Sequence, residues 1–190
     1  MTVRAHPGID ARAIGTMPSS SKYYHVPIEA WIERVSPNGR WGLVDIPFSW
    51  PQRDGWILIA GLQRETTRVQ VEIDLSQHRV TVTRFGERLF SMPAATGAPS
   101  SPTPPGRYFV TERVPFAAGG ALGSFAFGIS GIQPNLPPGW SGGNQLAIHG
   151  TNDPGSIGRS VSAGCVRVNE ASLHRLESLL ELGTPVVIEP

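Results

Sequence analysis

The sequence predicts a mainly β fold with one flanking helix near its C-terminus. Apolar and polar residues alternate from residue 67 onward, as they do in strands that bury one face. The 22 glycines and 18 prolines among 190 residues favour short strands and turns over long helices. Only residues 169–183 carry a convincing helical pattern.

Composition and charge narrow the possible functions. The hydrophobic share of 39% and the charged share of 16% are typical of a folded protein, and the length suits one domain with a short appendage. The 16 Lys and Arg against 15 Asp and Glu give a net charge of +1, so no bulk field attracts nucleic acid or an acidic membrane. No apolar run approaches the roughly 18 residues of a membrane span.

The N-terminal third divides into two predicted segments. Residues 1–25 are polar, with MPSSSK at their centre, and we expect a flexible arm there. They also lack the apolar core of an export signal. Residues 26–66 contain turn signals at PNG and PQRDG, which predict a small Trp-rich β hairpin. Four of the five tryptophans lie in this segment: Trp31, Trp41, Trp50 and Trp56.

Residues 67–190 are expected to form the main domain. The stretches 69–75 and 79–84 alternate apolar and polar residues, and RLFSMPAAT continues as a third strand after the FGER turn. These three strands predict an antiparallel meander. APSSPTPPG cannot pair as a central strand, because its prolines lack amide donors, so a surface loop precedes GRYFVTERV.

The C-terminal part contains a strand, a loop, the helix and a last strand. NQLAIHG is a short apolar strand that ends near His149, and TPVVIEP closes the chain. In NEASLHRLESLLELG, Asn169 is a suitable N-cap and Gly183 a suitable end. One face of this helix is apolar: Leu173, Leu176 and Leu180.

Cys165 is the only cysteine, which excludes an intramolecular disulfide. A thiol with an ordinary pKa of about 8.5 needs a base to act as a nucleophile, and of the five histidines only His149 shares its loop. Four glycines and a proline between the two residues make closure of the loop easy. A small buried apolar residue beside a structural histidine is the competing interpretation.

The neighbours of Cys165 fit acyl chemistry better than metal or phosphate binding. Gly164 lets the backbone adopt unusual dihedral angles, so that the amides of Gly164 and Cys165 can point at an oxyanion. The chain has no CxxC or HExxH motif and no GxxxxGK or GxGxxG loop. The sequence therefore predicts neither a metal nor another cofactor.

HGTNDPGSIGRSVSAGCVRV resembles the catalytic motif of the YkuD-type L,D-transpeptidases, a histidine in HGT followed by S-x-G-C-x-R/N. ATGAPSSPTPPGRY resembles the TG…TP-x-G-x-F/Y segment of the same family, and the resemblance covers about residues 67–190. The Trp-rich segment is similar to one that precedes this domain in some actinobacterial members. The residues on marked positions are His149, Gly150, Thr151, Ser162, Gly164, Cys165 and Arg167, with Thr96, Gly97, Thr103, Pro104, Gly106 and Tyr108 upstream.

The resemblance implies a β-rich, sandwich-like domain of mixed sheets and a cysteine L,D-transpeptidase. Cys165 would attack the carbonyl between the third residue of a peptidoglycan stem and its terminal D-alanine, releasing D-alanine and leaving a thioester. The side-chain amine of a second stem would then form a cross-link between third-position residues, with His149 as general base and acid. Two alternatives stay open, an L,D-carboxypeptidase that uses water as acceptor and a non-catalytic wall-binding module.

The resemblance also implies roles for neighbouring residues. Ser162 and Thr151 are expected to support the loop through hydroxyl bonds to the backbone, and Gly150 is expected to be part of the same loop support. A main-chain carbonyl is expected to orient His149, with Asn152 and Asp153 as outside candidates. Three residues are candidates for substrate contact: Arg167, which could instead pair with Asp153; Ala163, where many relatives carry His or Lys; and Tyr108, for which a core position is favoured.

Partners and location follow from the same resemblance. The expected partners are donor and acceptor peptidoglycan stem peptides, and the family is characteristically acylated by carbapenems. The substrate lies outside the cytoplasmic membrane, so we expect an extracytoplasmic location, in the periplasm or cell wall, although no signal peptide is visible in this chain.

Overall fold

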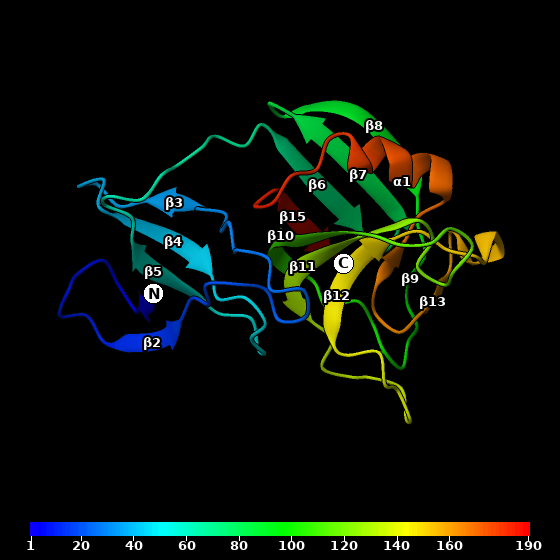
Figure 1. Cartoon of the computed structure of the whole chain (residues 1–190), viewed down its shortest axis with the longest axis horizontal. Helices are drawn as coiled ribbons and strands as arrows, with labels where there is room; N and C mark the ends of the chain where they lie inside the picture. The colour runs from blue at the N-terminus through cyan, green and yellow to red at the C-terminus, as the bar shows by residue number, and fades with distance from the viewer.

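A computed structural model describes all residues, 1–190, and shows two sheet units side by side (Figure 1). The larger sheet has eight strands in the order β14-β12-β11-β10-β15-β6-β7-β8. Its strands are β6 (Val69–Asp74), β7 (Arg79–Arg84), β8 (Glu87–Pro93), β10 (Gly106–Pro115), β11 (Phe125–Ile132), β12 (Gln145–His149), β14 (Val166–Arg167) and β15 (Pro185–Glu189). The first of these, β6, begins two residues after the predicted start of the main domain.

The predicted meander is confirmed. β6 pairs antiparallel with β7, and β7 with β8, so that the alternating residues share one face. That face is apolar because a period of two places every second side chain on the same side of a strand. The buried members are Val71, Ile73, Val80 and Val82.

The large sheet is mixed and curls around one core. β15 runs parallel to β6, and β12 runs parallel to β14, whereas the other neighbours are antiparallel. A single cluster of 20 buried apolar residues includes Val80 and Met92 from one end of the sheet and Ile148 and Val166 from the other. Because both ends contribute to one core, the mainly β, sandwich-like prediction is confirmed.

The helix α1 (Glu170–Glu177) begins where the sequence predicts. The Asn169 side chain accepts a hydrogen bond from the Ser172 amide at 2.8 Å, which caps the first turn. The helix ends earlier than expected, with Ser178 as its C-cap, although Leu180 beyond it stays fully buried. Gly183 has a φ of +73° and belongs to the following turn.

The prediction of a flexible arm over residues 1–25 is wrong. That segment contains β1 (Thr2–Arg4) and β2 (Ala13–Thr16), which join β5 (Asp54–Leu58), β4 (Trp41–Asp45) and β3 (Arg34–Val35) in a five-stranded sheet. The expected hairpin is the β4–β5 pair of this larger unit. Burial explains the order of the segment, because Val3 and Met17 pack into a second core of six apolar residues.

A buried polar junction joins the two units. The carboxylate of Asp45, at the end of β4, accepts a hydrogen bond from the Ser130 hydroxyl of β11 at 2.6 Å. The Phe48 amide donates to the Ser130 carbonyl at 2.6 Å, and the Phe109 amide donates to the Ser130 hydroxyl at 3.2 Å. Burial raises the pKa of Asp45 to about 7, with help from the nearby charge of Asp54.

The remaining elements are two short strands and a helical turn around the loop between His149 and Cys165. β9 (Thr96–Gly97) pairs in parallel with β13 (Ser160–Ser162), and η1 (Pro154–Ser156) is a 3₁₀ turn. None of the helices has the length and hydrophobicity needed to cross a bilayer.

Candidate active site

Two neighbouring strands position Cys165 and His149. In the parallel pair β12–β14, Ile148 lies opposite Val166, and His149 lies opposite Arg167. Cys165 directly precedes β14 and therefore lies beside Ala147. The thiol accordingly contacts β12, with its sulfur 3.9 Å from the Gln145 carbonyl oxygen.

Strand alternation places both candidate catalytic side chains on one face of the sheet. Opposed residues of neighbouring strands share a face, so Cys165 and Arg167 lie on the same face as Ala147 and His149. Ile148 and Val166 point to the other face and are buried in the core. Cys165 and His149 are thus diagonal neighbours, with Cα atoms about 7–8 Å apart by sheet geometry. No hydrogen bond joins thiol and imidazole in this resting structure.

The structure defines the tautomer of His149. Its Nδ1 lies 2.6 Å from the Gly150 carbonyl oxygen, and a carbonyl can only accept, so Nδ1 carries the hydrogen. Nε2 then holds a lone pair, as a general base requires. The expected main-chain carbonyl is therefore present, whereas Asn152 and Asp153 are exposed and do not bond the ring.

Burial controls the charge states of both side chains. His149 is only 4% exposed, and burial lowers its pKa to about 4; the charge of Arg167 acts in the same direction, and the hydrogen bond to Gly150 opposes it. Burial also raises the pKa of the Cys165 thiol, although the Ala147 backbone and Arg167 favour the thiolate. Neutral thiol and neutral imidazole are therefore the resting state near pH 7.

Ser162 holds the turn that leads into the cysteine. Its hydroxyl donates to the Cys165 carbonyl at 2.6 Å and accepts from the Gly164 amide at 3.0 Å. Gly164 has a φ of +121°, and a side chain there would overlap the amide group of Gln133. Both facts explain why a glycine is required at this position.

The same bonds revise the expected oxyanion donors. The Gly164 amide is already used by Ser162, so it is not the free donor that we expected. The Cys165 amide has no acceptor within the protein. It is an unpaired N–H on the candidate nucleophile itself and the donor that remains for an oxyanion.

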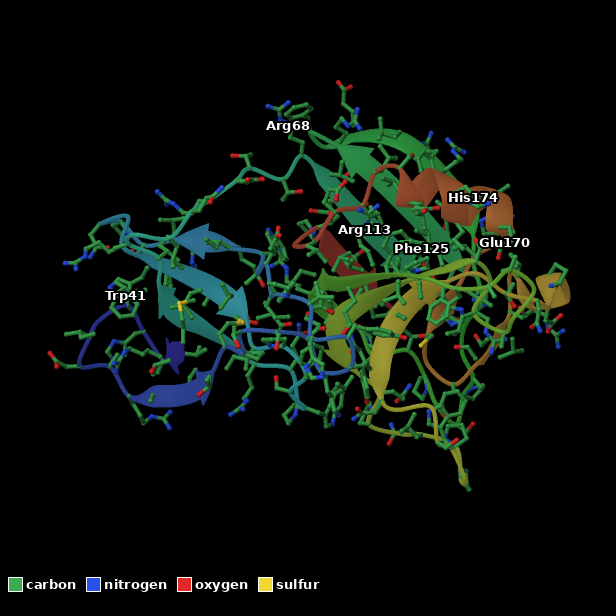
Figure 2. All side chains as sticks on the ribbon, viewed as in Figure 1. Trp41, Arg68, Arg113, Phe125, Glu170 and His174 are labelled. Atoms are coloured by element: carbon green, nitrogen blue, oxygen red, sulfur yellow. The ribbon has the colours of Figure 1, made fainter.

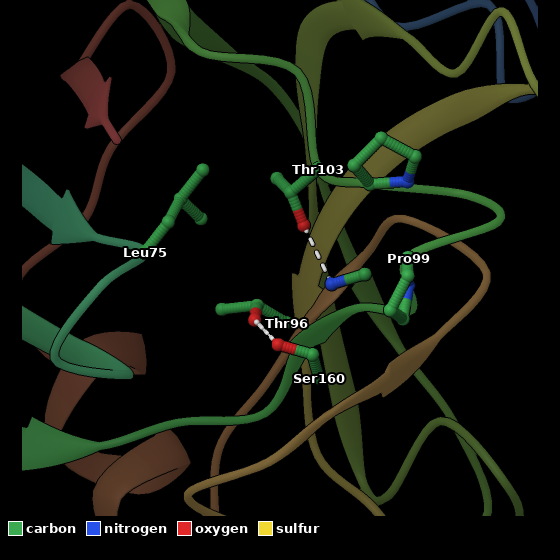
Figure 3. A pocket seen from close by; sticks show the side chains of 7 residues that line it. Leu75, Thr96, Pro99, Thr103 and Ser160 are labelled. Carbon is green, nitrogen blue, oxygen red and sulfur yellow. Dashed lines mark hydrogen bonds between the residues drawn. The ribbon is translucent and has the colours of Figure 1, made fainter.

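Behind this turn lies a small surface pocket of about 210 Å³ (Figure 3). The hydroxyl of Thr103 lies at its edge, accepting a hydrogen bond from the Gly97 amide at 2.8 Å. The hydroxyl oxygens of Thr96 and Ser160, which also line the pocket, lie 3.4 Å apart. The lining residues are Leu75, Thr96, Gly97, Pro99, Pro102, Thr103 and Ser160.

The guanidinium of Arg167 has no acidic partner. The structure contains no ion pair between Arg167 and Asp153, and Arg167 Nε is buried without an acceptor. Its backbone, by contrast, pairs with Ala95 in both directions. Arg167 is therefore fixed at the main chain, while its charged end is free to receive an anion. Ala163 is half-buried in the turn before Gly164.

Gly150 and Thr151 support the loop from its other end. The Thr151 hydroxyl accepts from the Asp153 amide at 3.0 Å, forming a local turn. A side chain at Gly150 would overlap the carboxylate of Glu170, which lies at the start of α1 and binds Ser124 (Figure 2). The close approach of these segments requires a glycine.

Tyr108 belongs to the core, the position that the sequence analysis favoured. Its ring is 2% exposed, and its hydroxyl donates to the Pro104 and Pro105 carbonyls. Sequence reasoning missed Gln133, a buried residue at the end of β11 whose amide donates to the Ser101 and Pro102 carbonyls. No local motif marks it, because its partners lie about 30 residues upstream.

Comparisons with known proteins identify the family of this chain. The family model of the YkuD L,D-transpeptidase catalytic domain matches residues 68–188. YkuD of Bacillus licheniformis, which is named for this family, is 28% identical over 135 residues, or 70% of this chain and 74% of that protein.

Solved structures share the fold. Bd1075 of Bdellovibrio bacteriovorus has a TM-score of 0.51 and 27% identity, over 65% of this chain and 48% of that one, so this chain spans about half of its length. An L,D-transpeptidase of Mycobacterium tuberculosis has a TM-score of 0.56 and 20% identity, over 84% of this chain and 80% of that one. With a family model that covers most of its length, the chain belongs to the YkuD L,D-transpeptidase catalytic domain family.

Proposed function

We propose that the chain is a cysteine L,D-transpeptidase that acts on peptidoglycan stem peptides. The observation that carries this proposal is the placement of Cys165 and His149 on one sheet face, with His149 Nε2 free and the Cys165 amide unpaired. Nucleophile, base and oxyanion donor are the three parts that acyl transfer requires.

In the first half-reaction, His149 Nε2 takes the thiol proton, and the sulfur attacks the carbonyl that joins the third stem residue to D-alanine. The negative charge that develops on the carbonyl oxygen is stabilised by the Cys165 amide. The tetrahedral intermediate collapses as the imidazolium returns its proton to the departing amine. D-alanine leaves, and the third residue remains as a thioester on Cys165.

In the second half-reaction, the side-chain amine of another stem attacks the thioester carbonyl. His149 removes a proton from that amine, the C–S bond breaks, and the thiolate leaves and is reprotonated. The product is an amide between two third-position residues. Arg167, whose guanidinium has no acidic partner, is proposed to bind a carboxylate of either stem.

The resting state has a chemical consequence for this scheme. Moving a proton from a thiol with a raised pKa to an imidazole with a pKa of about 4 is unfavourable in the free protein. The transfer becomes favourable only as charge forms on a bound acyl group. Substrate binding therefore favours formation of the thiolate, which limits side reactions of the cysteine.

The proposal extends to inhibitors and to location. Solved structures with this fold include a carbamoyl enzyme formed with avibactam and an L,D-transpeptidase in complex with imipenem. We expect Cys165 to be acylated by carbapenems through the same attack on a carbonyl. Stem peptides occur outside the cytoplasmic membrane, so we also propose an extracytoplasmic site of action.

Product analysis tests the reaction and its acceptor. The protein is incubated with a tetrapeptide stem, and the products are separated and identified by their mass. Release of D-alanine together with a cross-linked dimer is expected for a transpeptidase. Release of D-alanine with tripeptide alone assigns a carboxypeptidase, and unchanged tetrapeptide contradicts the proposal and favours a binding module.

A further inference from the structure

The peptide bond between Gly164 and Cys165 determines where the unpaired Cys165 amide points. This bond is trans, since the only cis peptide joins Trp50 and Pro51. In a trans peptide the carbonyl and the N–H point in opposite directions within one plane. Whatever holds the Gly164 carbonyl therefore also aims the Cys165 N–H.

The Gly164 carbonyl is held by Thr103. The Thr103 hydroxyl donates to this oxygen at 2.8 Å and accepts from the Gly97 amide at 2.8 Å. Thr103 is only 2% exposed, so water does not compete for these bonds. Both hydrogen-bonding roles of the hydroxyl are filled, which fixes its direction.

Gln133 holds the segment that carries Thr103. Its amide nitrogen donates to the Ser101 carbonyl at 3.1 Å and to the Pro102 carbonyl at 2.9 Å, and its side chain is 3% exposed. The same amide group lies directly against Gly164, where a side chain would overlap it. Gln133 thus contacts Gly164 and ties down the loop that ends at Thr103.

We propose that Thr103 is a positioning residue for acyl transfer, held in place by Gln133. Thr103 fixes the peptide plane before Cys165 and thereby aims the Cys165 N–H at the developing oxyanion. The inference rests on the proposed function, because it concerns the acylation step. It adds to that function a residue that acts through the backbone of the nucleophile without contacting the reacting atoms.

Two reactions of Cys165 separate this role from general loss of structure. Acylation by a carbapenem builds negative charge on an oxygen and needs the aimed N–H. Alkylation by iodoacetamide is a displacement at a carbon and forms no oxyanion, so it reports only the accessibility and ionisation of the thiol. The ratio of the two rate constants, followed by intact mass, measures the oxyanion donor alone.

The test compares four variants of the full chain. Thr103→Val removes the hydroxyl at nearly constant shape, Thr103→Ser keeps it, and Gln133→Met removes both amide donors. Gln52→Met is the matched control, because Gln52 also bonds a main chain, that of Arg107, but lies at the junction of the two units. Thermal unfolding of each variant verifies that it is folded, and Gln133→Met keeps the test available if Thr103→Val does not fold.

We expect Thr103→Val and Gln133→Met to slow acylation about 10- to 100-fold while alkylation stays within about 3-fold of the wild type. Thr103→Ser and Gln52→Met are expected to stay within about 3-fold for both reactions. Equal losses in the two reactions, no loss in either, or a slow Thr103→Ser would overturn the inference. If the wild type itself is not acylated, the proposed function fails instead.

Discussion

The imidazole of His149 donates its Nδ1 hydrogen to the carbonyl oxygen of Gly150, at 2.6 Å. This single bond selects the tautomer and leaves the lone pair on Nε2, on a side chain that shares its sheet face with Cys165. In the absence of a carboxylate partner, burial dominates the titration and lowers the pKa of His149 to about 4. The imidazole is therefore neutral, as the proposed general base must be, well below pH 7.

The first prediction concerns the acid limb of acylation. Because His149 must be neutral to accept the thiol proton, the carbapenem acylation rate should fall to half near pH 4. With an ordinary histidine, whose pKa is 6.5, the acylation rate would fall to half near pH 6.5. The rate is measured by intact mass from pH 3.5 to 8, and a midpoint above pH 6 would contradict the assigned environment of His149.

Folding must be followed in the same experiment. The folded pKa of His149 lies below its unfolded value of 6.5, so the unfolded chain binds more protons between pH 6.5 and 4. The contribution of His149 to stability is complete above pH 6.5 and is lost as the pH falls toward 4. Over this range the loss lowers the free energy of unfolding by about 3 kcal/mol. Tryptophan fluorescence distinguishes unfolding from protonation of the active base.

A second prediction concerns Arg167. Its guanidinium has no acidic partner, so Arg167→Gln should weaken the use of a stem peptide with a free carboxylate by about 10-fold, mainly through KM. A carboxamide version of the same peptide should be affected about 3-fold or less. Steady-state release of D-alanine measures both. Equal effects on the two peptides would show that Arg167 does not recognise a carboxylate.

A third prediction assigns a structural role to Ser162. Ser162→Ala leaves the Gly164 amide without its acceptor and the Cys165 carbonyl without its donor, both in a buried turn. The free energy of unfolding should fall by about 1–3 kcal/mol. Urea denaturation measures the loss. Ser162→Thr retains the hydroxyl and serves as the control, and an Ala variant as stable as the wild type would refute the role.

A fourth prediction concerns the junction between the two units. The folded pKa of Asp45 is raised to about 7 from 3.8, so the folded chain binds more protons between these values. Its contribution to stability is complete below pH 3.8 and is lost as the pH rises through 7. Asp45→Asn cannot ionise. The difference in the free energy of unfolding between Asp45→Asn and the wild type should therefore shift in favour of the variant by about 3 kcal/mol as the pH rises from 5 to 8.5.

Comparing the variant with the wild type at each pH cancels the other titrating groups. Asp54→Asn is the matched control, since Asp54 is an exposed neighbour whose charge contributes only secondarily to the shift at Asp45. Its relative stability should change by less than about 1 kcal/mol over the same range. A constant difference between Asp45→Asn and the wild type would show that Asp45 is already ionised at pH 5.

The parts of this fold that are local in sequence could be predicted from it. The β6–β8 meander follows from strict alternation and tight turns, and the start of α1 follows from Asn169. By contrast, β1 has only three residues, too few to show a period, and its partner β5 lies about 50 residues away. The burial of Val3 in the second core explains why that segment is structured. This burial cannot be predicted from the residues next to Val3 in the sequence.

The candidate site divides in the same way. His149 and Cys165 lie within one loop motif, so the sequence alone predicts both as candidate residues. The Thr103 hydroxyl bonds a carbonyl 61 residues away, and this contact exists only once β9 and β13 are paired. The choice of oxyanion donor also depended on the folded turn, because Ser162 takes the Gly164 amide.

The central claim is that Cys165 carries the acyl group. Its most direct test is the intact mass of the protein after brief incubation with a tetrapeptide stem, for the wild type, Cys165→Ala and His149→Ala. We predict a wild-type adduct equal to the stem without D-alanine, no adduct on Cys165→Ala, and adduct formation slowed about 100-fold or more on His149→Ala. An adduct that persists on Cys165→Ala, or D-alanine release without Cys165, would contradict the account.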